Sequence, residues 1–102
     1  MERIELTSYD RIIIACSGGK DSLAALLHLL VCGAPVDRME VWHHDVDGQG
    51  SSFMDWPSTT PYVHAVADYF EIPCYLSWRE RGLKGEILRD GVPTAAVLCE
   101  TP

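Results

Sequence analysis

The sequence has no long hydrophobic run, no cysteine framework and no excess of positive charge, and each absence excludes a class of protein. Its longest apolar stretches are far shorter than the roughly 20 residues that a helix needs to cross a bilayer. The four cysteines form neither a C-x-x-C pair nor a zinc-finger spacing, which favours reduced thiols. A net charge of −7 argues against broad, nonspecific binding to nucleic acid.

The remaining features are those of one small globular domain. The chain has 102 residues, of which 47% are hydrophobic and 23% charged, and we expect a single domain over residues 1–102. The first five residues lack the charged-then-apolar layout of a signal peptide, so we expect a cytoplasmic protein. Three cysteines fall in strand-like apolar runs, and most of the thiols are expected to be buried: Cys16, Cys74 and Cys99.

Apolar runs and helical spacings alternate along the chain. Residues 12–16 form a continuous apolar run, as in a parallel strand buried on both faces. The alternation predicts an α/β fold, a three-layer α/β/α arrangement with a small, mostly parallel, doubly wound sheet. The expected strands are 11–16, 38–44, 72–78 and 93–99, and the expected helices are 21–32, a segment starting near Ser58 or Thr60, and 82–90. Residues 46–56 form a Gly/Ser-rich connection that is expected to be mobile.

The turn after the first strand has the composition of a phosphate site. Residues 17–22 read Ser-Gly-Gly-Lys-Asp-Ser. The two glycines let backbone N–H groups approach an anion, and the following helix adds its positive end. Lys20 supplies a charge and the two serines supply hydroxyl donors. Asp21 either helps to hold Mg²⁺ or caps the helix.

Two common nucleotide motifs do not describe this turn. A Walker A loop requires Ser or Thr after Gly-Lys and a glycine five positions before the second glycine. Here Gly19-Lys20 is followed by Asp21, and Ile14 stands five positions before Gly19. The dinucleotide fingerprint G-x-G-x-x-G is also absent. A different kind of phosphate loop is therefore predicted.

The hexapeptide matches the S-G-G-x-D-S signature of the PP-loop, or N-type ATP pyrophosphatase, superfamily. Beyond it, the chain resembles the phosphoadenosine phosphosulfate (PAPS) reductase family at residues 43–48, 56–61 and 77–80. The resemblance implies an adenine nucleotide alpha hydrolase-like fold that binds ATP or an adenylyl sulfate, with Mg²⁺ where it is catalytic. ATP-using members of the superfamily cleave between the α- and β-phosphates and pass AMP to an acceptor.

The expected ligand site lies at the carboxyl ends of the strands, where open parallel sheets bind substrates. Lys20 and Asp21 are the catalytic candidates, and Arg79 is the candidate for a substrate anion. His43, Asp45 and Asp47 could share a strand face and bind a metal, but we favour Asp45 as a nucleotide contact without metal. The predicted nucleotide contacts are Ser17, Gly18, Gly19, Lys20, Asp21, Ser22 and Asp45.

Three functions remain open from the sequence. The first is a PP-loop enzyme with an unidentified acceptor, and the second is a nucleotide-binding remnant without catalysis, since family members are commonly longer. The third, less favoured, is a nucleic-acid sulfur-modification component that uses the basic cluster of residues 79–89. Family reductases use a C-terminal Glu-Cys-x-Gly type motif, whereas Cys99-Glu100 has the reverse order. No iron–sulfur cluster is therefore predicted, and a homodimer is expected because a small sheet leaves apolar surface uncovered.

Overall fold

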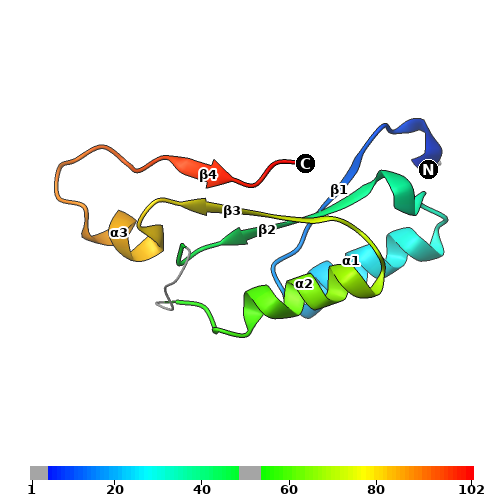
Figure 1. The fold of residues 1–102 in the computed structure, drawn as a ribbon, viewed down its shortest axis with the longest axis horizontal. Helices are drawn as coiled ribbons and strands as arrows, with labels where there is room; N and C mark the ends of the chain where they lie inside the picture. The colour runs from blue at the N-terminus through cyan, green and yellow to red at the C-terminus, as the bar shows by residue number, and fades with distance from the viewer. Residues whose placement is uncertain (1–4, 49–53) are drawn as a thin grey trace.

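The computed structural model describes residues 5–48 and 54–102, which form a small α/β fold (Figure 1). Residues 49–53 of the predicted mobile connection lie outside the described residues. The strands are β1 (Ile12–Ala15), β2 (Met39–Asp45), β3 (Cys74–Arg79) and β4 (Val97–Cys99). The α-helices are α1 (Lys20–Val31), α2 (Thr59–Tyr69) and α3 (Gly82–Leu88).

The four strands form one open sheet in the order β1-β2-β3-β4. The first three strands are parallel, with Ile14 opposite Val41 and Val41 opposite Cys74, and β4 pairs antiparallel with β3. The predicted α/β class and the mostly parallel sheet are confirmed. The fourth strand is shorter than expected, because residues 89–96 run as irregular chain before Val97.

Helices α1 and α2 lie side by side on one face of the sheet (Figure 1). Alternate strand residues point toward them, as the two-residue period of a strand requires. One buried cluster joins Ile14 and Val41 of the strands to Leu26 of α1 and to Val63 and Ala67 of α2. This cluster fixes both helices against the sheet and so places their N-termini at its carboxyl edge.

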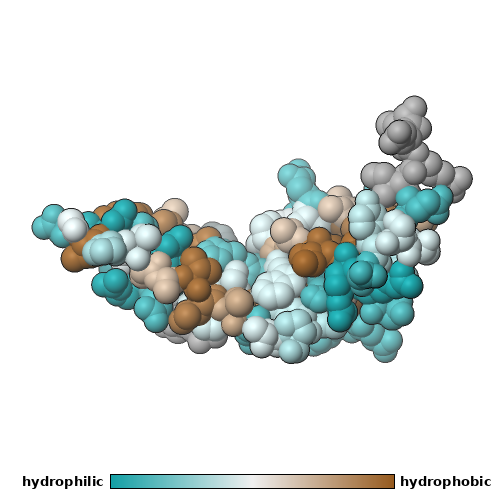
Figure 2. Space-filling model, turned by 90° about the horizontal axis from the view of Figure 1, so that it is seen from above, coloured by the Kyte–Doolittle hydropathy of each residue, from teal (hydrophilic) through white to brown (hydrophobic). Residues whose placement is uncertain are grey.

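The opposite face of the sheet is largely accessible. Ile13, which alternates with the buried Ile14, is 61% exposed. The rings of Trp42 and Tyr75 lie on neighbouring strands with centroids 5.2 Å apart. Figure 2 views the molecule from the side away from α1 and α2 and shows apolar patches among hydrophilic surface. This face therefore carries apolar area that α1 and α2 do not cover.

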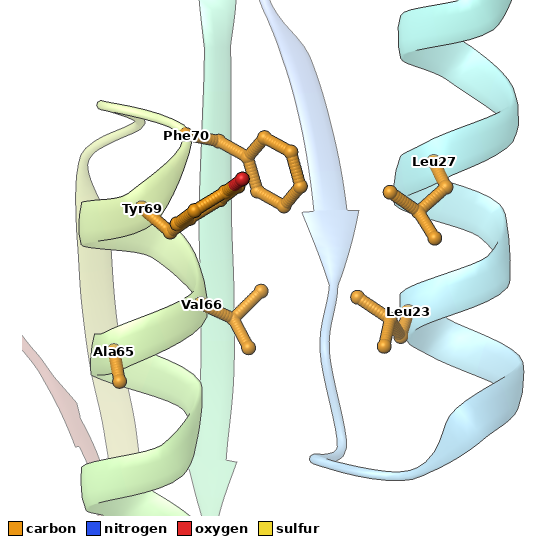
Figure 3. Close-up of a pocket in the computed structure, with 6 residues that line it drawn as sticks. All are labelled: Leu23, Leu27, Ala65, Val66, Tyr69 and Phe70. Atoms are coloured by element: carbon orange, nitrogen blue, oxygen red, sulfur yellow. The ribbon is translucent and has the colours of Figure 1, made fainter.

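A shallow apolar groove also runs between the two long helices (Figure 3). Leu23 and Leu27 of α1 face Val66 and Phe70 of α2 across a hollow of about 340 Å³. Among residues 5–48 and 54–102, no helix combines the length and apolar character that crossing a bilayer requires.

Two adjacent leucines of α1 provide a test of the core. Leu26 is fully buried, whereas Leu27 is 42% exposed at the rim of the groove. Leu26→Ala should lower the free energy of unfolding by about 2–5 kcal/mol, because it leaves a cavity among packed side chains. Leu27→Ala should cost clearly less. Urea unfolding followed by circular dichroism measures both changes, and equal losses would contradict this placement of the core.

Candidate functional site

The chain reverses direction at Gly18, immediately after β1. Gly18 has a φ of +90°, in the left-handed region that side chains rarely adopt. A Cβ added there would lie 2.9 Å from Cγ2 of Thr59, at the start of α2. The turn therefore requires glycine for its conformation and for its close approach to α2. Gly19, with a φ of −91°, then caps the N-terminus of α1.

Ser17 and Ser22 close the turn with their hydroxyl groups. The N–H of Ser17 donates to Oγ of Ser22 at 3.2 Å, and that hydroxyl donates to the carbonyl oxygen of Gly19 at 3.1 Å. The N–H of Gly19 donates to Oγ of Ser17 at 3.3 Å. These bonds hold residues 17–22 as a compact loop at the positive end of α1, where backbone N–H groups favour an anion.

Lys20 and Asp21 occupy the first turn of α1, and both are exposed. Lys20 can therefore reach an anion bound at the loop as a mobile point charge. Asp21 lies beside it with its carboxylate accessible to solvent or to a cation. Within the described residues, no group of three or more metal-ligating side chains is assembled. The structure brings all six residues of the predicted loop together.

His43, a residue that the sequence interpretation left without a fixed role, anchors the start of the loop from β2. Its side chain is 2% exposed, and its Nδ1 donates to the carbonyl oxygen of Cys16 at 2.8 Å. The N–H of Cys16 in turn donates to the carbonyl oxygen of Trp42 at 2.8 Å. The sequence signal for this role is a polar residue at an inward-facing strand position that follows the apolar Met39 and Val41 on the same face.

The chain after β2 is held by its own acidic side chains. Oδ1 of Asp45 accepts the N–H of Asp47 at 3.2 Å. The Asp47 carboxylate accepts the N–H groups of Met54 and Asp55, each at 2.8 Å. Because these acceptors and Nδ1 of His43 are used on backbone groups, the arrangement favours structural roles over the metal cluster considered from the sequence. Asp45 itself is half-buried at the end of β2.

Gly82 fixes where this segment meets α3. A Cβ at Gly82 would lie 2.1 Å from the carbonyl oxygen of Asp47, and its φ is +63°. The N–H of Leu83 donates to the carbonyl oxygen of Val46 at 2.7 Å. Helix α3 is thereby attached to the carboxyl edge of the sheet, beside the end of β2.

Arg79, the predicted anion contact, is engaged with the segment that leads into β4. Its guanidinium donates to Oγ1 of Thr94 at 2.8 Å and to the carbonyl oxygen of Ala95 at 2.7 Å. Thr94 in turn donates to Glu86 at 2.6 Å. That hydrogen bond, together with the nearby Arg89, lowers the pKa of the Glu86 carboxyl group, which therefore stays ionised beside Arg79.

Two neighbouring hollows open at this edge of the sheet. The loop hollow, about 430 Å³, is lined by Ala15, Cys16, Ser17, Trp42, His44, Val46 and Ser77. The Arg79 hollow, about 90 Å³, is lined by His44, Val46, Arg79, Leu83 and Glu86. Ser17 of the loop and Arg79 therefore line adjacent hollows that share His44 and Val46 as a wall. His44 and Ser77 were not predicted as site residues, although polar residues at strand ends are a signal for such a role.

The cysteines are more exposed than the sequence suggested. Cys16 is buried and Cys74 half-buried, but Cys32 and Cys99 are exposed, which corrects the expectation of mostly buried thiols. Val31 and Cys32 end a helix at the surface, and β4 is exposed along its length, so an apolar sequence run did not imply burial there. Burial raises the pKa of the Cys74 thiol to about 11, with a smaller contribution from Cys16.

No protein-family model matches this chain, and no curated protein or solved structure matches it either.

The turn can be tested with two glycines that share a conformation. Gly18 and Gly33 have φ values of +90° and +87°, but a Cβ at Gly33 would meet nothing within 4 Å. Gly33→Ala should cost about 1 kcal/mol for the left-handed backbone alone. Gly18→Ala should cost more, because the added methyl also meets Thr59. Urea unfolding measures both, and a smaller loss for Gly18→Ala would contradict the described turn.

Proposed function

We propose that this chain is a PP-loop adenine-nucleotide-binding protein similar to the PAPS reductase family, with ATP or an adenylyl sulfate as its ligand. The observation that supports this best is the loop of residues 17–22. It combines a left-handed Gly18, a network of serine hydroxyls and the N-terminus of α1. A phosphate chain placed there would meet backbone N–H groups and the charge of Lys20.

In this proposal the residues of the loop divide their roles. Gly18 and Gly19 contact phosphate through N–H groups and Ser22 through its hydroxyl, and Lys20 offsets phosphate charge. The Gly19 N–H and the Ser22 hydroxyl would exchange their present partners, Oγ of Ser17 and the carbonyl oxygen of Gly19, for the phosphate. Asp21 would hold Mg²⁺, which when bound supplies further charge neutralisation on the phosphates. The loop hollow extends from Ser17 to His44 and Ser77 and offers space for the nucleoside, whereas Asp45, the predicted nucleotide contact of β2, does not line it.

We further propose that the reaction, where it occurs, breaks the bond between the α- and β-phosphates and transfers AMP to an acceptor. Arg79 is the candidate for an anionic group of that acceptor, across the wall that His44 and Val46 form. The second candidate is nucleotide binding without turnover. A three-layer, doubly wound arrangement remains part of the proposal, although within residues 5–48 and 54–102 the sheet face opposite α1 and α2 is largely accessible.

The same face supports the proposal of a homodimer, since it exposes apolar area that a second copy would cover. A cytoplasmic location remains part of the proposal. Nucleic acid is a less favoured partner, because Arg79 and Arg89 direct their guanidinium groups to partners within the chain.

Lys20 provides the binding test. Lys20→Ala should weaken the binding of ATP by about 10-fold to 150-fold, the equivalent of one charge-assisted hydrogen bond. Arg11→Ala removes the same charge at the opposite end of β1 and should leave binding nearly unchanged. Isothermal titration calorimetry with ATP and Mg²⁺ measures both. Equal effects of the two variants would show that net charge, and not the loop, binds the nucleotide.

The nucleotide products distinguish cleavage between the α- and β-phosphates from cleavage between the β- and γ-phosphates. With ATP, Mg²⁺ and water as the acceptor, the proposed chemistry gives AMP and pyrophosphate, which anion-exchange chromatography separates from ADP and phosphate. ADP and phosphate would contradict the PP-loop assignment. Tight ATP binding with neither product, in the presence of candidate acceptors, would favour the binding protein without turnover.

A further inference from the structure

His44 lies where the two hollows of the site meet. It lines the loop hollow together with Ser17, and it lines the Arg79 hollow together with Arg79. A group bound beside Arg79 and a nucleotide held by Ser17 would therefore approach one another at this imidazole. His44 is exposed at the carboxyl end of β2, so its ring is accessible to groups in either hollow.

The orientation of the ring is set from the neighbouring strand. Nδ1 of His44 lies 2.9 Å from Oγ of Ser77, its register partner in β3. When Nδ1 carries the proton and donates to Ser77, Nε2 is the basic nitrogen. Among the described residues, the Ser77 contact is the one hydrogen bond that the His44 side chain makes, so Nε2 is available to a ligand. This is the base-plus-orienting-group arrangement that acid–base catalysis uses.

The other basic groups nearby are bonded or lie outside the hollows. His43 donates to Cys16 through Nδ1, and its Nε2, which has no hydrogen-bond partner among the described residues, is buried away from both hollows. Asp45 accepts from the backbone of Asp47 and lines neither hollow. Glu86 is bonded to Thr94 and Arg89. Histidine is also the side chain that most often serves as a general base.

We infer that His44 is the base that accepts the proton of the attacking group of the acceptor, and this inference rests on the adenylyl-transfer function proposed above. The acceptor, X–H, attacks the α-phosphorus of ATP. The X–P bond forms, the bond between the α-phosphorus and the bridging oxygen breaks, and pyrophosphate leaves with that electron pair. The proton of X–H passes to Nε2 of His44 and from there to solvent. Lys20 offsets the charge of the departing pyrophosphate.

The test uses water as the acceptor and compares His44→Ala with His28→Ala. His28 is an exposed histidine of α1 that lines neither hollow and contacts Cys32. His44→Ala should slow AMP formation from ATP and Mg²⁺ by about 10²- to 10⁴-fold, the usual contribution of a general base. Added imidazole should restore part of the rate. His28→Ala should match the wild-type rate and should not respond to imidazole.

Binding of α,β-methylene-ATP, measured by calorimetry, separates the possible failures. His44→Ala should bind this analogue as the wild-type protein does. An unchanged rate of AMP formation in His44→Ala, or a slow rate that imidazole does not raise, would overturn the role of His44 alone. Wild-type protein that binds the analogue but forms no AMP would overturn adenylyl transfer and this inference together. Absence of binding would overturn the nucleotide site itself. His44→Gln, which keeps a polar side chain of similar size, should be as slow as His44→Ala.

Discussion

The left-handed turn at Gly18 is the constraint on which the rest of the site depends. It brings the end of β1 against Thr59 at the start of α2, while α1, capped by Gly19, begins at Lys20. The N-termini of two helices therefore converge at one end of the sheet, with their unsatisfied N–H groups at the same edge. A side chain at position 18 would have to separate α2 from the loop, and the serine network would lose its geometry.

The site is assembled from the ends of three strands, and each strand end contributes a different group to it. The loop of residues 17–22 follows β1. The second strand supplies His43 and His44, whose side chains point to opposite faces of the sheet because the two residues are adjacent in a strand. Nδ1 of His43 donates to the carbonyl oxygen of Cys16, whereas His44 lines both hollows. The third strand then orients that second ring through Ser77.

The loop of residues 17–22 and its position were predictable from the sequence, because they depend on the local chemistry of neighbouring residues. The apolar run before Ser17, the two glycines and the helical spacing after Lys20 place the loop correctly between β1 and α1. The hollows were not predictable, since they depend on which strands are neighbours and in what register. The partners of Arg79 were missed for the same reason: Thr94 and Ala95 lie in an irregular segment whose path no periodicity indicates.

The contact between Gly82 and Asp47 has a consequence for how the chain acquires its structure. It joins backbone segments that are 35 positions apart in the numbering, and no side chain separates them. Such a contact forms only after the loop between the segments has closed, and parallel strand pairing imposes a similar delay on β1, β2 and β3. The carboxyl edge of the sheet is therefore expected to order late in folding, after α1 has formed from its local contacts.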